Sequence, residues 1–151
     1  MHTPTKLLFA LALASGAAAV AAQAPTLPTV QLTAGIHVIT AEVAAQDPAR
    51  ARGLMFRKAL PPNHGMLFIF DRKDLHCMWM RNTLIALSVA FVEDDGTIVN
   101  IEHMQPHDEG RHCARRPVRY ALEMEQGWFG GKGVGPGSKL GRLPAGQPQQ
   151  K

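Results

Sequence analysis

The sequence lacks the features that would fix it in a membrane. Its longest apolar stretch, residues 7–22, has 16 residues, and a membrane-spanning helix needs about 20. The first of its two cysteines is Cys77, so no cysteine stands near the N-terminus to carry a lipid anchor. The sequence therefore predicts no stable membrane anchor.

Residues that mark common enzyme classes are also scarce. Beyond residue 22 there are only two serines, Ser88 and Ser138, and neither lies in the motif of a hydrolase nucleophile. The glycine-rich run 127–137 lacks the GKS or GKT ending of a phosphate-binding loop. We therefore expect no cofactor, and an uncharacterised hydrolytic enzyme stays open only as an alternative.

The acidic residues form no evident catalytic pair. Asp94 and Asp95 belong to a predicted hairpin turn. Glu123 and Glu125 alternate with apolar residues of a predicted strand, which places both on its solvent face. Neither pair is expected to work as general acid and base.

The charge is only mildly basic. Removing residues 1–22 takes away Lys6 and no acidic residue, and leaves a formal net charge of +3. The arginines are spread along the chain and form no basic stripe with interleaved aromatic residues. The sequence therefore predicts no nucleic-acid partner.

The N-terminus has the three regions of a secretory signal peptide. Lys6 precedes an apolar run at 7–13, and small residues follow up to residue 24. We expect cleavage after Ala21 or Ala22 and a periplasmic or secreted protein. The expected organisation is a signal peptide at 1–22, an N-terminal extension at 23–35, a single domain at 36–143 and a disordered tail at 144–151.

Hydrophobic periodicity predicts a strand-rich domain. Apolar and polar residues alternate over 37–44, as in a half-buried strand. Asp47 followed by Pro48 is typical of a helix start, and we expect a helix from there through Met55. Asp95-Gly96 predicts a tight hairpin. Further strands are expected at 66–70, 77–82, 85–92, 98–102, 119–125 and near 139–143, with a short turn or helix at Trp128. These elements predict an α+β fold, a mainly antiparallel, curled or barrel-like sheet with one principal helix.

Several sequence blocks resemble the domain of unknown function 192 family, a group of small, mostly bacterial and often exported domains. The blocks are RGLMFR (52–57), GMLF (65–68), WMRNT (79–83), DDGTIV (94–99), MQP (104–106), RYALEM (119–124) and GxGPGxxL (133–140). The resemblance implies the fold and its boundaries, but this family has no agreed activity. Where relatives commonly read NTLIPLD this chain reads NTLIALS, so Ser88 replaces an aspartate and no role of that aspartate is carried over.

The polar residues of these blocks suggest a binding site. In the family pattern Arg52, Arg57, Asn82 and Thr83 are the polar signature, and guanidinium groups recognise carboxylates in a bidentate way. We expect an accessory or binding module that recognises a small anionic or polar ligand, or an exported protein partner, where the helix meets the strand 77–82. The residues assigned to this site are Arg52, Arg57, Trp79, Arg81, Asn82 and Thr83. The alternative is structural, with these groups binding backbone carbonyls and tying the helix to the sheet.

A metal site is a second alternative function. Met78 and Met80 share one face of the predicted strand, and soft thioethers select Cu(I). His103, His107 and His112 could assist with copper or zinc, but their spacing matches no closed zinc motif. The simpler interpretation places the methionines in the core and the histidines in solvent.

The two cysteines carry the most specific structural prediction. Cys77 and Cys113 are the only cysteines of a chain that a signal peptide would deliver to an oxidising compartment. We expect one intramolecular disulfide between them. Two free thiols or a shared metal are the alternatives, and a redox catalyst is disfavoured because the CxxC spacing is absent.

Overall fold

The computed structural model describes residues 26–146. The predicted signal peptide at 1–22 and the last residues of the predicted tail lie outside this range. Within it, the structure contains no helix with the length and apolar character required to span a bilayer.

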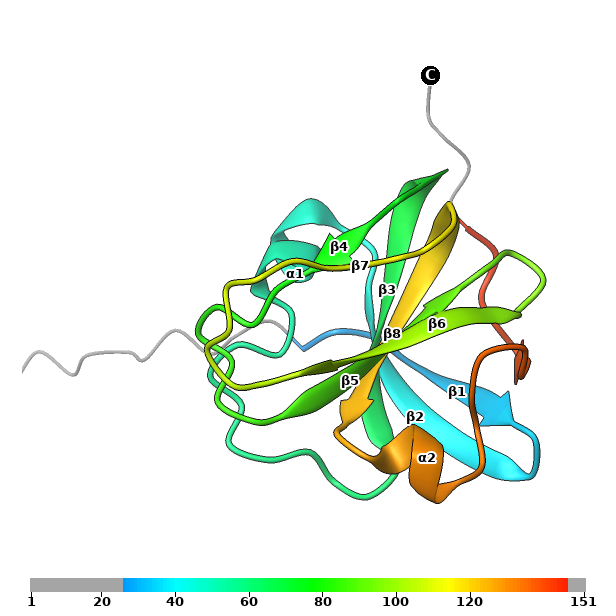
Figure 1. Ribbon diagram of the computed structural model, residues 1–151, viewed down its shortest axis with the longest axis horizontal. Coiled ribbons are helices and arrows are strands. Elements are labelled where there is room, and N and C mark those ends of the chain that lie inside the picture. The colour runs from blue at the N-terminus through cyan, green and yellow to red at the C-terminus, as the bar shows by residue number, and fades with distance from the viewer. Residues whose placement is uncertain (1–25, 147–151) are drawn as a thin grey trace, which may run out of the picture.

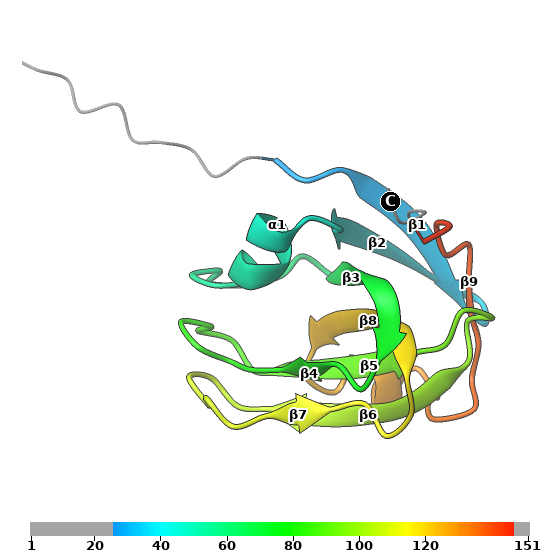
Figure 2. The same ribbon diagram turned by 90° about the horizontal axis from the view of Figure 1, so that it is seen from above.

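The main element is a sheet of seven strands in the order β6-β5-β8-β3-β2-β1-β9, which curls into a half-barrel (Figures 1 and 2). Its strands are β1 (Thr29–Ala34), β2 (His37–Ala44), β3 (His64–Asp74), β5 (Leu87–Val92), β6 (Ile98–Met104), β8 (Val118–Glu125) and β9 (Leu140–Gly141). A second sheet pairs β4 (Cys77–Met78) with β7 (His112–Cys113). The two helices, α1 (Asp47–Arg52) and α2 (Trp128–Gly131), are both short.

The sheet is mixed, although most of its strand pairs are antiparallel as expected. β2 and β3 run parallel, with Thr40 opposite His64 and Ala44 opposite Phe68. A parallel pair needs a crossover that carries the chain back to the same end of the sheet. Residues 45–63 form this crossover, and α1 lies in it beside β2 and β3 (Figure 2).

The prediction of a helix through Met55 is wrong. α1 ends at Arg52, because Gly53 takes a positive φ of 48° and its N–H closes the last turn on the Ala49 carbonyl. Residues 53–56 form turns instead, and Phe56 itself has a positive φ of 64°. The N-cap residue is Gln46 and not the expected Asp47, which is the first residue of the helix.

The predicted strand at 77–82 is also wrong beyond Met78. The Met80 N–H donates to the Asp108 carbonyl at 2.7 Å, and Asn82 turns the chain with a φ of 54°. Residues 79–83 are therefore a turn whose side chains do not alternate between two faces. The expected N-terminal extension, in contrast, contains β1, which pairs with β2 along its whole length.

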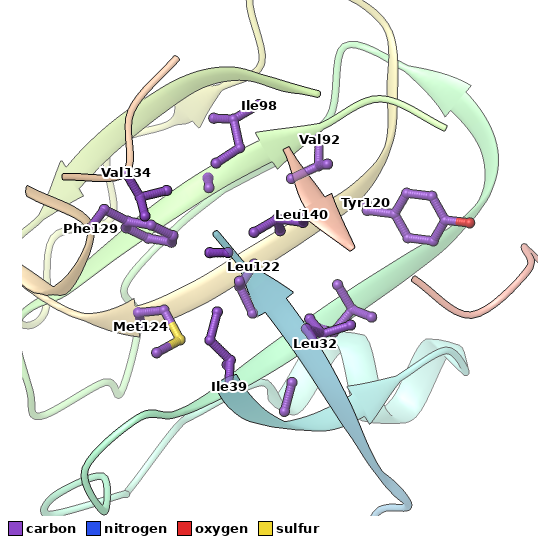
Figure 3. Close-up of a cluster of buried hydrophobic side chains, with 14 of the residues drawn as sticks. Leu32, Ile39, Val92, Ile98, Tyr120, Leu122, Met124, Phe129, Val134 and Leu140 are labelled. Atoms are coloured by element: carbon purple, nitrogen blue, oxygen red, sulfur yellow. The ribbon is translucent and has the colours of Figure 1, made fainter. Parts of the chain in front are cut away.

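Buried apolar side chains cover both faces of the central strands. One cluster, shown in Figure 3, includes Leu32, Ile39, Leu122, Met124 and Phe129 of α2. The other includes Leu54, Met66, Phe68, Met80 and Ala121. Because β8 lies between β3 and β5, its side chains contribute to both clusters, and neither of its faces is open to solvent over most of its length.

Candidate functional site

A groove of about 950 Å³ runs along α1 and the turn that follows it, and the second half of β2 and the start of β3 help to line it. Its apolar lining includes Leu27, Met55, Phe56 and Met66. Its polar lining includes Glu42, Arg52, Arg57 and His64. The groove thus combines a mainly apolar surface with two guanidinium groups.

The two arginines of the groove differ in their partners. Arg57 Nη2 lies 2.7 Å from Glu42 Oε2, so its charge is already paired within the protein. The Arg52 side chain is exposed and makes neither a hydrogen bond nor an ion pair with any residue between 26 and 146. Arg52 is therefore the guanidinium of this groove that is available to an anion.

The other predicted site residues lie outside the groove. Trp79 and Thr83 line a separate cavity of about 50 Å³, which Arg52 and Met55 also line, and we call it the small cavity. Arg52 is the only one of the six predicted site residues that lines both spaces.

Arg81 and Asn82 line neither space. Arg81 Nε lies 3.8 Å from Glu109, and its guanidinium lies 5.9 Å from the centre of the Trp79 ring. The Asn82 carbonyl accepts a hydrogen bond from the Phe56 N–H at 2.9 Å. Asn82 therefore joins the two turns that flank the small cavity, which is a structural role.

The arginine that ties α1 to the sheet is one that the sequence did not single out. The Arg50 guanidinium donates to the carbonyls of Ala45 and Ile69 and pairs with Asp47 and Asp71. The sequence signal for this role was the position of Arg50 three residues after Asp47, a spacing at which side chains on a helix can pair. This structural role, proposed as the alternative for Arg52 and Arg57, belongs to Arg50.

The prediction that Glu123 faces water is wrong. It is only 3% exposed, because both faces of β8 are covered, and it lines the small cavity. No residue in the described part of the chain forms a hydrogen bond or ion pair with its carboxyl group. Burial raises the pKa of Glu123 to about 8, so it is mainly protonated at neutral pH. Glu125 is exposed as expected.

The predicted metal-binding residues lie in different surroundings. Met80 is fully buried in the core, Met78 packs against the same cluster, and His107 is an exposed turn residue. His112 Nε2 lies 3.0 Å from Asp108 Oδ2. Among residues 26–146 no three or more His, Cys, Asp or Glu side chains are grouped so that they could hold a metal.

A serine and a histidine do lie together, on β5 and β6. Ser88 Oγ lies 2.8 Å from His103 Nδ1. Ser88 is fully buried and lines neither the groove nor the small cavity, so a substrate has no evident path to it. The contact satisfies a buried hydroxyl.

The expected disulfide is confirmed. Cys77 and Cys113 lie directly opposite each other in β4 and β7, and their sulfurs are bonded at 2.05 Å. The bond joins two segments that are 36 residues apart in the sequence. It holds β4, which leads into the Trp79–Thr83 turn, against β7.

Comparison with known proteins places the chain in a family. The model of DUF192, described as "Uncharacterized ACR, COG1430", matches residues 29–141, and the chain belongs to this family, as the sequence blocks predicted. The chain is 40% identical to a "putative transcription regulator" from Sinorhizobium meliloti 1021, with a TM-score of 0.69 over 74% of this chain and 90% of the other. It is 34% identical to a protein of unknown function from Novosphingobium aromaticivorans DSM 12444, with a TM-score of 0.73 over 80% and 94% of the two chains. No curated protein matches it.

Proposed function

We propose that this protein is an exported binding module that holds a small ligand with an apolar body and an anionic group in the groove beside α1. The observation that carries the proposal is the Arg52 guanidinium, which pairs with no described residue, on the wall of a groove of about 950 Å³. Ligand sites typically have volumes of about 300 to 1,000 Å³, an apolar lining and a few polar groups that orient the ligand.

The arrangement of charges supports an anionic group on the ligand. Glu42 neutralises Arg57, which leaves Arg52 as the cation that gains most from an incoming carboxylate or phosphate. The exposed Phe56 and half-buried Met55 beside it offer surface to an apolar chain. Export is supported by the disulfide, because such bonds persist mainly outside the cytosol.

Straight-chain carboxylates from propionate to octanoate provide a direct test. We expect the melting temperature to rise with each of them, and more with the longer chains, because they bury more apolar surface in the groove. Arg52→Ala is expected to weaken binding, measured by titration calorimetry, by about tenfold or more, since a hydrogen bond to a charged group contributes about 1.5–3 kcal/mol.

The matched control is Arg72→Ala, which removes an exposed cation from β3 at a position that does not line the groove. It should leave binding unchanged. The proposal fails if no carboxylate stabilises the protein, or if Arg72→Ala weakens binding as much as Arg52→Ala does.

A further inference from the structure

The small cavity is lined by a buried carboxyl group, that of Glu123, which does not line the groove. The buried Glu123 lines it together with Met78, Trp79, Thr83 and residues 50–55. A carboxyl group this deeply buried almost always has a partner, yet no described residue supplies one to Glu123. The missing partner points to a bound group that enters the cavity.

We propose that the small cavity is an ammonium subsite in which Glu123 is the counter-ion, so that the ligand bridges Glu123 and Arg52 and is an α-amino acid or a similar small zwitterion. The inference rests on the proposed function, because the same Arg52 binds the anionic group. It adds the substrate class, since a ligand with an ammonium group and a carboxylate on one carbon matches a carboxyl group and a guanidinium that line one space.

The size and lining of the cavity favour an ammonium group over other cations. About 50 Å³ accommodates one small polar group and not a whole ligand. A divalent metal ion needs several oxygen ligands, and the cavity offers the side-chain oxygens of only Glu123 and Thr83.

Binding an ammonium group also has a consequence for protons. The titratable groups that line the cavity with Glu123 are Arg50 and Arg52 of α1; the lining residues from β3, β4 and the 79–83 turn have none. Since burial keeps Glu123 mainly protonated at neutral pH, it must lose its proton to pair with an ammonium group that already carries its charge. The amine keeps its proton, and the Glu123 proton goes to the buffer.

Three probes that share the isobutyl group of leucine separate the two charges. L-Leucine has both groups, 4-methylpentanoate lacks the amine, and 3-methylbutylamine lacks the carboxylate. At pH 8 we expect leucine to bind the purified protein about tenfold or more tightly than 4-methylpentanoate, because it adds a charge-assisted hydrogen bond. Glu123→Gln should remove this preference and leave the affinity for 4-methylpentanoate unchanged.

The inference is overturned if leucine binds no more tightly than 4-methylpentanoate, or if Glu123→Gln retains the preference. If 3-methylbutylamine binds through Glu123 while 4-methylpentanoate does not bind, the proposed anion site is wrong and the ammonium subsite stands. If no probe binds, both are wrong and the cavity holds only solvent.

A measurement on the unaltered protein does not depend on how the variant folds. Calorimetry of leucine binding at pH 6.5, in two buffers with different ionisation enthalpies, should show the release of close to one proton. At pH 9 the release should fall towards zero, because Glu123 is then already ionised. Binding at pH 6.5 without proton release would contradict the role of Glu123.

Discussion

Replacing Glu123 with glutamine is expected to raise the free energy of unfolding at pH 8 by about 3–5 kcal/mol. Burial raises the pKa of Glu123 from 4.5 to about 8 in the folded protein. Below pH 4.5 both the folded and the unfolded states keep the proton. Between pH 4.5 and 8 only the unfolded state loses it, so stability falls by up to about 1.4 kcal/mol per pH unit and levels off above pH 8. Glutamine cannot ionise, and the variant should lack this decline.

Urea unfolding at pH 4.5, 6 and 8 would measure the effect. Glu125→Gln is the matched control, because Glu125 lies two residues further along the same strand but is exposed. At pH 4.5 the parent and Glu123→Gln should have similar stability, and the control should follow the parent at every pH. An equal pH dependence in Glu123→Gln and the parent would show that the carboxyl group is not desolvated.

Removing the disulfide is the second change with a large expected effect. Cys77→Ser with Cys113→Ser should lower the free energy of unfolding by about 3–4 kcal/mol, because the bond closes a loop across a separation of 36 residues and restricts the unfolded chain. Urea unfolding of the double variant and of the parent should differ by this amount without reductant.

Reductant provides the control for this second prediction. It should bring the parent close to the double variant and leave the double variant unchanged. Intact mass after thiol alkylation would check the bond itself, and two alkylated cysteines in the unreduced parent would contradict it.

The parts of the fold that follow from local pattern could be predicted. The alternation of 37–44 gave β2, and Asp95-Gly96 gave the hairpin, where the Thr97 N–H donates to Asp95 at 2.9 Å. The end of α1 at Gly53 was also a local signal, because glycine is the usual residue at a helix C-terminus, and the prediction missed it. The turn at Asn82 could not be predicted in this way, because it depends on contacts with distant residues, such as the bond from the Phe56 N–H to the Asn82 carbonyl.

The candidate site shows the same division. Arg52 was predicted as a site residue from its place in the RGLMFR block. The sequence did not show that Glu42 pairs with Arg57, which leaves the Arg52 guanidinium without a carboxylate partner among the described residues. Glu123 was predicted to face solvent because polar and apolar residues alternate along its strand. Such a strand has a solvent-exposed face only if nothing covers the sheet on that side. Here the curl of the sheet and the chain that follows α1 cover the second face as well. This is a property of the whole domain and not of the strand.

The parallel pairing of β2 with β3 also has a consequence for the order in which we expect the chain to fold. The hairpins β1–β2 and β5–β6 join neighbouring segments and close short loops, which is entropically cheap and fast. β2 and β3 pair only after residues 45–63 have crossed from one end of the sheet to the other. Since the groove takes its walls from both strands and from this crossover, we expect it to form late in folding, after the two hairpins.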